Sequence, residues 1–275
     1  MRSLLDKQQA GDKQQAEKKL VGEKAAELVE DGMIVGLGTG STAFFMIRRL
    51  AERVRDGLRI TGVATSRRTH EMAASLGIRV VDVNDVDSID LTIDGADEID
   101  DRLNAIKGGG GALLREKLVA SISKRVVLII DSTKRVDRLG RFPLPVEIVP
   151  FAWKHTLKKL EREGYRAQIR EKDGALFVTD GGNYIIDLHD LYKIEDPRKL
   201  EASINNLPGV VENGLFTGLV TDMLIAENGR RSPNRHDGPQ TGGTVRHLQR
   251  RIPRHAANEL LGHRHRAIPE RWFRS

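Results

Sequence analysis

The chain has 275 residues, of which 39% are hydrophobic and 31% are charged, and its formal net charge is +6. The absence of cysteine excludes disulfide scaffolds, thiolate metal sites and a cysteine nucleophile. No apolar run approaches the roughly 18 residues that a membrane span needs, and the first residues lack the apolar core of a secretion signal. We therefore expect a cytoplasmic protein with one large domain or two modest ones.

The positive charge is confined to the C-terminal end of the sequence. Residues 230–275 contain 11 Arg, no Lys, five of the eight His and three acids, which leaves 34 basic and 36 acidic side chains for residues 1–229. Because this segment follows no steady helical or strand period, we expect it to be a disordered basic extension. Specific nucleic-acid binding is not expected of the body of the chain.

Strand-like and helix-like segments alternate along the first half of the body. The apolar pattern predicts, in chain order, helix Lys13–Glu30, strand Met33–Leu37, helix Ser41–Val54, strand Arg59–Ala64, helix Thr69–Leu76, strands Arg79–Val83 and Ile89–Ile93, helix Gly111–Ile122 and strand Arg125–Ile130. This alternation, together with continuous apolar strands, is typical of a parallel sheet with helices on both faces. The sequence therefore predicts an α/β protein with a Rossmann-like sheet.

A proline-rich stretch, residues 143–150, precedes a change of rhythm, and we interpret it as a domain boundary. Beyond it the pattern predicts helix Trp153–Glu163, strands Tyr165–Arg170, Leu176–Thr179 and Tyr184–Asp187, and helix Pro197–Asn205. These elements indicate a smaller α+β unit.

A glycine-rich segment, residues 36–42, lies between the first predicted strand and its helix. Its glycines, its hydroxyls and the free N–H groups of the helix offer donors to an anion. The segment lacks the third glycine of a dinucleotide fingerprint and the lysine of a P-loop, and no acid follows the second strand. We interpret it as a site for a small phosphate; the alternative is a plain tight turn between strand and helix.

An acidic segment, residues 94–101, begins where strand Ile89–Ile93 ends, at the sheet edge where α/β proteins bind ligands. The spacing of its acids does not match a calcium loop. We expect Asp94 and Asp97 to serve sugar hydroxyls or proton transfer. The remaining acids, Glu98, Asp100 and Asp101, are expected to form a solvated loop.

Four consecutive glycines follow Lys107 and lead into the helix that carries Glu116. One hypothesis is that Glu116 is a carboxylate base facing a ligand, with Lys107 stabilising negative charge that develops on it. The alternative for Glu116 is an exposed salt-bridge partner. Lys134, just beyond strand Arg125–Ile130, is a candidate second cation at the same edge, although a surface lysine would look the same in sequence.

In combination these motifs resemble those of the A-type ribose-5-phosphate isomerases. GLGTGST, DGADEID, KGGGGALLREK, DSTKRVDRLGRFPLPVE and INNLPGVVENGLF occur in the family's order, and the resemblance covers about residues 13–229. It implies a Rossmann-like catalytic domain from residues 1–140 and 217–229 and a small α+β, ferredoxin-like domain from residues 141–216. Residues 230–275 would then be an atypical Arg/His-rich extension.

The resemblance also implies a reaction, which is the interconversion of D-ribose 5-phosphate and D-ribulose 5-phosphate through an enediolate in the non-oxidative pentose phosphate pathway. It implies no metal and no nucleotide cofactor, a small phosphorylated sugar as substrate, and a homodimer or homotetramer. Glu116 matches the catalytic base, Asp94 and Asp97 the acids that contact the sugar and assist ring opening and proton movement, and Lys107 the cation beside the enediolate. The implied substrate-binding residues are Thr39, Gly40, Ser41, Thr42, Gly95, Ala96, Gly108, Gly109, Gly110, Lys134 and Lys18.

Two other functions use similar residues. A sugar-phosphate sensor domain of a transcription regulator would bind the same ligand without turnover, but the roughly 30 residues before the first strand are too few for a DNA-binding module. An acyl transferase with a glutamate nucleophile is the other option, although the acids and Lys107 suit a sugar better than a thioester. Turnover distinguishes the isomerase from the sensor, and dependence on an acyl donor identifies the transferase.

Overall fold

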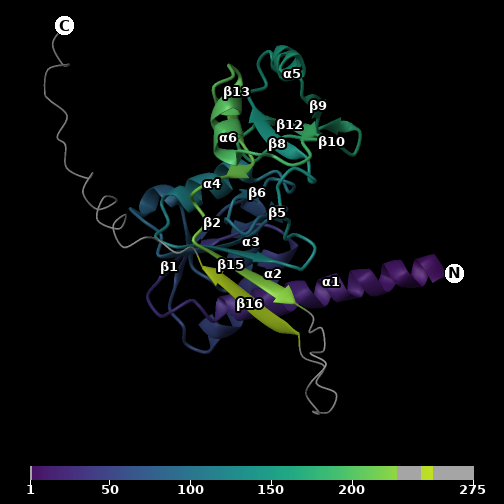
Figure 1. Cartoon of the computed structure of the whole chain (residues 1–275). Coiled ribbons are helices and arrows are strands. Elements are labelled where there is room, and N and C mark those ends of the chain that lie inside the picture. The colour runs from purple at the N-terminus through teal and green to yellow at the C-terminus, as the bar shows by residue number, and fades with distance from the viewer. Residues whose placement is uncertain (1, 228–242, 250–275) are drawn as a thin grey trace, which may run out of the picture.

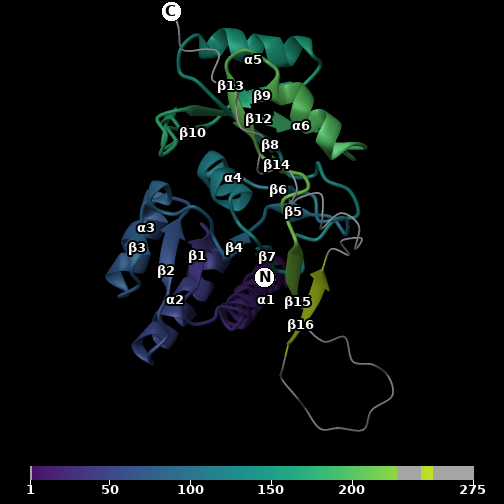
Figure 2. The same ribbon diagram turned by 90° about the vertical axis from the view of Figure 1, so that its left-hand side faces the viewer.

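The computed structural model describes residues 2–227 and 243–249. These residues form a larger unit around a parallel sheet and a smaller unit that lies at one end of it (Figures 1 and 2). In this part of the chain no helix is both long enough and apolar enough to span a membrane.

The larger unit is built on a sheet whose seven described strands follow the order β16-β15-β7-β4-β1-β2-β3. Their bounds are Ile34–Leu37 (β1), Thr61–Ala64 (β2), Val80–Val81 (β3), Leu91–Gly95 (β4), Val126–Ile130 (β7), Asp222–Glu227 (β15) and Thr244–Gln249 (β16). Neighbouring strands pair in parallel except β16, which runs antiparallel to β15. The order from β3 to β15 is that of a doubly wound sheet, which confirms the predicted α/β class.

Helices cover both faces of this sheet. α1 (Arg2–Ala26), α2 (Ser41–Arg55) and α3 (Arg67–Ser75) contribute to the cluster on one face, and α4 (Leu113–Ser121) contributes to those on the other. Because side chains alternate along a strand, Val127 and Ile129 of β7 pack in the first cluster, whereas Leu128 and Ile130 pack on the opposite face. The fully buried strand β7 therefore reads as a continuous apolar run.

The smaller unit has an antiparallel sheet in the order β13-β8-β12-β9. The chain passes through β8 (Leu144–Ile148), α5 (Trp153–Arg162), β9 (Arg166–Ile169), β12 (Tyr184–His189), α6 (Pro197–Asn205) and β13 (Val210–Asn213). This βαββαβ succession with two packed helices is the ferredoxin-like arrangement. A short hairpin, Glu171–Lys172 (β10) and Ala175–Leu176 (β11), extends from it.

A three-stranded sheet joins the two units. Its strands are Glu98–Ile99 (β5), Ala105–Ile106 (β6) and Leu215–Phe216 (β14), in the order β14-β6-β5. A one-turn 3₁₀ helix, Val83–Asp85, completes the described elements. After β14 the chain returns to the main sheet as β15.

Three expectations from the sequence differ from the structure. The proline-rich stretch, interpreted above as a domain boundary, is itself part of the smaller unit, because it contains β8, an inner strand of the small sheet. Glu98 and Asp100 are buried because backbone N–H groups bind their carboxylates, so of the three acids expected in a solvated loop only Asp101 is exposed. Strand character was also expected through Thr179, yet β11 ends at Leu176.

The fourth difference concerns the basic extension. Its residues 244–249 form β16, so the expectation of disorder is wrong for this segment; residues 230–242 and 250–275 lie outside the described residues. The segment gains backbone hydrogen bonds from the edge of β15, and these do not depend on an apolar repeat. Val245 and Leu248 then pack against clusters on opposite faces of the sheet.

Candidate active site

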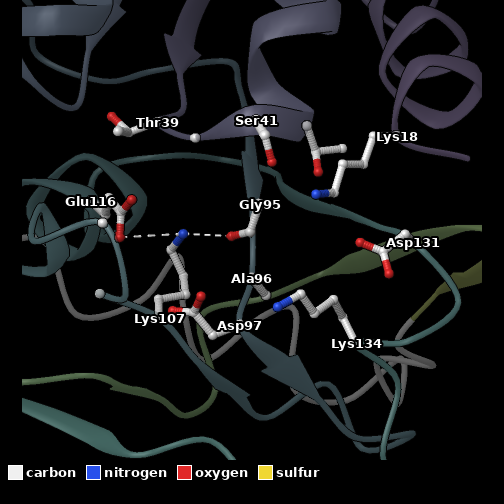
Figure 3. Close-up of a pocket in the computed structure, with 14 residues that line it drawn as sticks. Lys18, Thr39, Ser41, Gly95, Ala96, Asp97, Lys107, Glu116, Asp131 and Lys134 are labelled. Atoms are coloured by element: carbon white, nitrogen blue, oxygen red, sulfur yellow. Dashed lines mark hydrogen bonds and ion pairs between the residues drawn. The ribbon is translucent and has the colours of Figure 1, made fainter. Parts of the chain in front are cut away.

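A cavity opens at the carboxyl ends of the parallel strands, where loops after β1, β4 and β7 meet α1 and α4 (Figure 3). This is the edge at which doubly wound sheets bind ligands. The residues that line it are Lys18, Thr39, Gly40, Ser41, Thr42, Gly95, Ala96, Asp97, Lys107, Gly108, Gly110, Glu116, Asp131 and Lys134.

The loop after β1 presents the N-terminus of α2 to this cavity. Gly40 has φ 118°, a conformation that favours glycine, and it caps α2 without a side-chain hydrogen bond in the described structure. The first N–H groups of α2, beside Ser41 and Thr42, are thus available to an anion. Thr39 is held by the hydroxyls of Thr65, Ser66 and Thr69 at 2.8, 2.8 and 3.1 Å.

Asp94 holds the same loop in place through hydrogen bonds to its backbone. Its Oδ1 accepts hydrogen bonds from the N–H groups of Thr39 at 3.0 Å and Gly95 at 2.7 Å. A side chain at Gly38 would collide with this carboxylate, since its Cβ would lie 2.2 Å from Oδ1. The close approach of Asp94 to the backbone therefore explains the glycine at position 38.

Lys107 lies at the centre of the site. Its ammonium donates to the Gly95 carbonyl at 2.5 Å and lies 3.3 Å from Glu116 Oε2 (Figure 3). It also lies 3.1 Å from Asp94 Oδ2. Burial lowers the pKa of Lys107, but the two carboxylates outweigh that effect and hold the pKa above its ordinary value. Lys107 therefore stays charged, which it must do if it is to stabilise negative charge in the cavity.

Glu116 borders the cavity, yet it is buried and its hydrogen-bonding capacity is not fully used by the described residues. Its Oε2 accepts no hydrogen bond from the described residues, although it lies against the Lys107 ammonium. Loss of hydration raises the pKa of Glu116 to about 8; Lys107 opposes the rise, and Asp94 and Asp97 reinforce it. Burial also raises the pKa of Asp94, and the Lys107 ammonium and the N–H groups of Gly95 and Thr39 oppose that rise.

The other end of the cavity is cationic. Lys18 from α1 and Lys134 from the loop after β7 extend their ammonium groups toward it, across the cavity from Glu116 (Figure 3). Lys134 also lies 5.7 Å from the centre of the Phe142 ring. Between the two ends, Asp97 lines the cavity and accepts the N–H of Gly109 at 2.7 Å.

The structure brings the predicted site residues together around one cavity, with two in supporting places. Asp94 lies behind the wall that Thr39 and Lys107 form, and Gly109 is bound to Asp97 beside it. Sequence reasoning missed Asp131, a buried acid near Lys134 that accepts hydrogen bonds from Gln14 and Thr133. Its place directly after the apolar strand β7 is the signal that could have identified it.

Comparisons with known proteins show which family the chain resembles. A family model described as ribose 5-phosphate isomerase A (phosphoriboisomerase A) matches residues 61–230. Ribose-5-phosphate isomerase A of Sphingopyxis alaskensis is 52% identical over 211 residues, which cover 77% of this chain and 92% of that relative.

Solved structures give the same result. Ribose 5-phosphate isomerase from Plasmodium falciparum matches with a TM-score of 0.79 and 36% identity, covering 86% of this chain and all of that one. A D-ribose-5-phosphate isomerase in complex with phospho-erythronic acid matches with a TM-score of 0.75 and 35% identity, covering 85% of this chain and 97% of that one.

Proposed function

The chain belongs to the ribose 5-phosphate isomerase A family, and from this premise we propose that Glu116 is the base of its reaction. The reaction is the interconversion of ribose 5-phosphate and ribulose 5-phosphate, an aldose–ketose isomerisation of the pentose phosphate pathway. A small phosphorylated sugar is accordingly the substrate.

The chemistry begins with the open-chain aldose. The Glu116 carboxylate removes the proton from C2, and the electrons of that C–H bond form the C1–C2 double bond while negative charge moves to O1. Lys107 stabilises the resulting enediolate, and removal of one such preorganised donor typically costs about 3 kcal/mol of transition-state stabilisation. Protonated Glu116 then returns the proton to C1, and the proton of the C2 hydroxyl passes to O1, leaving the ketone.

The remaining residues bind and orient the sugar in this proposal. Asp97, on the cavity wall, contacts a sugar hydroxyl and assists ring opening. The family resemblance implied the same role for Asp94, but its position behind the wall supports an indirect contribution, in which it orients Lys107 and the Thr39 backbone. The phosphate binds to Lys18, Lys134 and the N-terminus of α2. Because the phosphate is at the far end of the sugar, its binding there holds C2 in front of Glu116.

The observation that carries this proposal is the state of Glu116. A carboxyl that borders the cavity, is withdrawn from water and has a pKa near 8 can both accept and return a proton near neutral pH. An exposed salt-bridge partner, the alternative considered from the sequence, would be solvated, whereas only about 5% of Glu116 is exposed.

The test is ribulose 5-phosphate formation from ribose 5-phosphate in excess EDTA, with the wild-type chain and Glu116→Gln. We expect turnover by the wild type and a loss of about 10²- to 10⁴-fold in the variant, with ribose 5-phosphate binding retained within about threefold. Asp100→Asn is the matched control, because Asp100 is also a buried acid but lies outside the cavity.

Two outcomes would contradict the proposal. A loss of binding as large as the loss of rate would make Glu116 a structural residue. Saturable binding of ribose 5-phosphate by a wild-type chain without turnover would favour the sensor considered from the sequence.

The assembly and the location of the enzyme are part of the proposal. We expect a homodimer or homotetramer, which multi-angle light scattering of the full chain measures. We also expect the enzyme in the cytoplasm, where a charged sugar phosphate is retained, and cell fractionation tests this.

A further inference from the structure

Lys117 is a buried lysine directly after the proposed base. Leu113, Glu116, Lys117 and Ala120 have the spacing i, i+3, i+4, i+7, so they share the buried face of α4. Glu116 faces the cavity, but Lys117 reaches the smaller unit instead. It has no place in the mechanism above.

The Lys117 ammonium has a complete set of partners from the smaller unit and its return segment. It donates to Glu201 Oε1 of α6 at 2.8 Å, to Glu212 Oε1 of β13 at 2.8 Å and to the Asn213 carbonyl at 2.9 Å. These contacts join α4 to α6 and to the segment that leads from β13 into β14.

The partners of Lys117 are held in turn. Glu212 Oε1 also accepts the Asn205 side-chain amide at 2.7 Å and the Asn213 N–H at 2.9 Å. Glu201 accepts the hydroxyl of Thr217 through its second oxygen. Glu201 and Glu212 are therefore held in fixed positions as acceptors, so the Lys117 ammonium has a single arrangement of partners to bind.

Lys107 is attached to the same segment. Its backbone N–H donates to the Gly214 carbonyl at 2.9 Å, and its ammonium lies 5.5 Å from the centre of the Phe216 ring. The Lys117 ammonium lies 5.2 Å from the centre of that ring. Residues 212–217 thus contact both lysines. Lys117 follows the proposed base in sequence, and Lys107 is the proposed cation for the enediolate.

Stability alone does not account for this network. A buried ammonium with two carboxylates is expensive to desolvate, and apolar side chains of similar volume often serve stability equally well. What the network adds is a defined geometry between elements that are distant in sequence. The ion pair of Glu116 and Lys107, 3.3 Å apart, joins α4 to the segment directly after β6.

We propose that Lys117 is a positioning residue for the isomerisation: its anchor on Glu201, Glu212 and the Asn213 carbonyl holds α4 so that Glu116 stays in place against Lys107. The inference rests on the proposed function, in which Glu116 is the base. Lys117 acts through Glu116 and does not touch the substrate.

The experiment is steady-state kinetics of Lys117→Met and Lys117→Arg from pH 6 to 10, with thermal unfolding of each variant. Small misplacements of a catalytic group cost up to about 100-fold in rate, so we expect the kcat of Lys117→Met to fall about 10- to 100-fold while KM stays within about threefold. Lys117→Arg keeps a cationic donor and is expected to recover most of the loss. The acid limb of kcat/KM should move to higher pH in Lys117→Met, because Glu116 loses contact with the Lys107 charge.

The matched control is Lys124→Met, which removes an exposed lysine that is paired with Asp90 just beyond the C-terminal end of α4 and should leave kinetics unchanged. Folded Lys117→Met with wild-type kcat and acid limb would overturn the inference and leave Lys117 a purely structural role. If Lys117→Met does not fold, Glu201→Gln weakens the same anchor; a loss of about threefold or more in kcat supports the inference, and an unchanged kcat overturns it.

The two proposals can fail separately. Turnover that survives in Glu116→Gln would refute the proposed base whatever Lys117 does. Loss of turnover in Glu116→Gln, together with wild-type activity in Lys117→Met, would refute the positioning role alone.

Discussion

Three ionisable groups, Asp94, Lys107 and Glu116, are buried together. Their charges do not balance, because one ammonium faces two carboxylates at 3.1 and 3.3 Å. Backbone N–H groups compensate Asp94, and nothing equivalent among the described residues compensates Glu116 Oε2. Burial raises the pKa of both carboxyls, and that of Glu116, the one that borders the cavity, reaches about 8, a value suited to a base that returns its proton.

This environment predicts the pH dependence of the rate. Only ionised Glu116 can accept the C2 proton, and its pKa of about 8 lies well above the ordinary value of 4.5. The rate constant kcat/KM should therefore rise with pH and level off above 8, and at pH 6 it should be about one hundredth of the plateau. Initial rates across buffers from pH 5 to 10 measure this profile.

Glu116→Gln should show no such limb in its residual rate, which provides the control. An acid limb near the ordinary carboxyl value of 4.5 would contradict the assignment, since it would mean that Glu116 is solvated or that another group is the base. Lys107 adds no alkaline limb near neutrality, because its pKa is held above the ordinary lysine value.

At the scale of elements, α1 is fastened to the loop that follows β7. Glu17, which is 2% exposed, accepts hydrogen bonds from the N–H and the hydroxyl of Ser132 at 2.9 and 2.7 Å. Gln14 on the same helix reaches Asp131 at 3.2 Å. The two cations at the proposed phosphate end, Lys18 and Lys134, follow Glu17 and Ser132 closely in sequence, so this contact sets their separation.

Glu17→Ala should therefore weaken binding of the phosphate more than it slows the chemistry. We expect KM for ribose 5-phosphate to rise about tenfold with kcat within about threefold, because the loss falls on ground-state binding. Steady-state kinetics measure both constants. Glu23→Ala, which removes a half-buried acid on the same helix, is the control; a fall in kcat with unchanged KM would show that the contact serves another purpose.

At the scale of the whole molecule, the family model ends at residue 230, whereas the sheet ends with β16 at residues 244–249. β16 pairs with β15 over its full length, and its His247 lies 2.6 Å from Asp222, which also binds Arg125. An uncovered strand edge is a template for pairing with other chains. We therefore expect β16 to protect the edge of the main sheet from self-association.

Removal of residues 230–275 tests this role. We expect the shortened chain to unfold several degrees lower and to associate beyond the dimer or tetramer expected of the full chain, while kcat per folded subunit stays within about twofold. Thermal unfolding and light scattering measure these quantities. Unchanged stability and assembly state would show that β15 does not need this cover.

Local sequence carries much of the fold and of the candidate site. Strand β7 is recognisable because every side chain in it is apolar, and α6 because Asp196 caps it and Pro197 occupies its first turn. The site motifs are contiguous, and they follow parallel strands whose carboxyl ends meet at one edge. Sequence alone therefore placed Thr39, Asp97, Lys107, Glu116 and Lys134 at one edge of the sheet.

Tertiary structure decided what depends on contacts between distant segments. The sequence of α4 does not tell whether Glu116 is solvated; burial, reinforced by Asp94 and Asp97 and opposed by Lys107, raises its pKa. Residues 200 to 217 give Lys117 its partners, and β15 gives β16 a place in the sheet. The physical reason is the same in each case: hydration, charge pairing and edge hydrogen bonds depend on which groups surround a residue in space, and a linear pattern records only its neighbours along the chain.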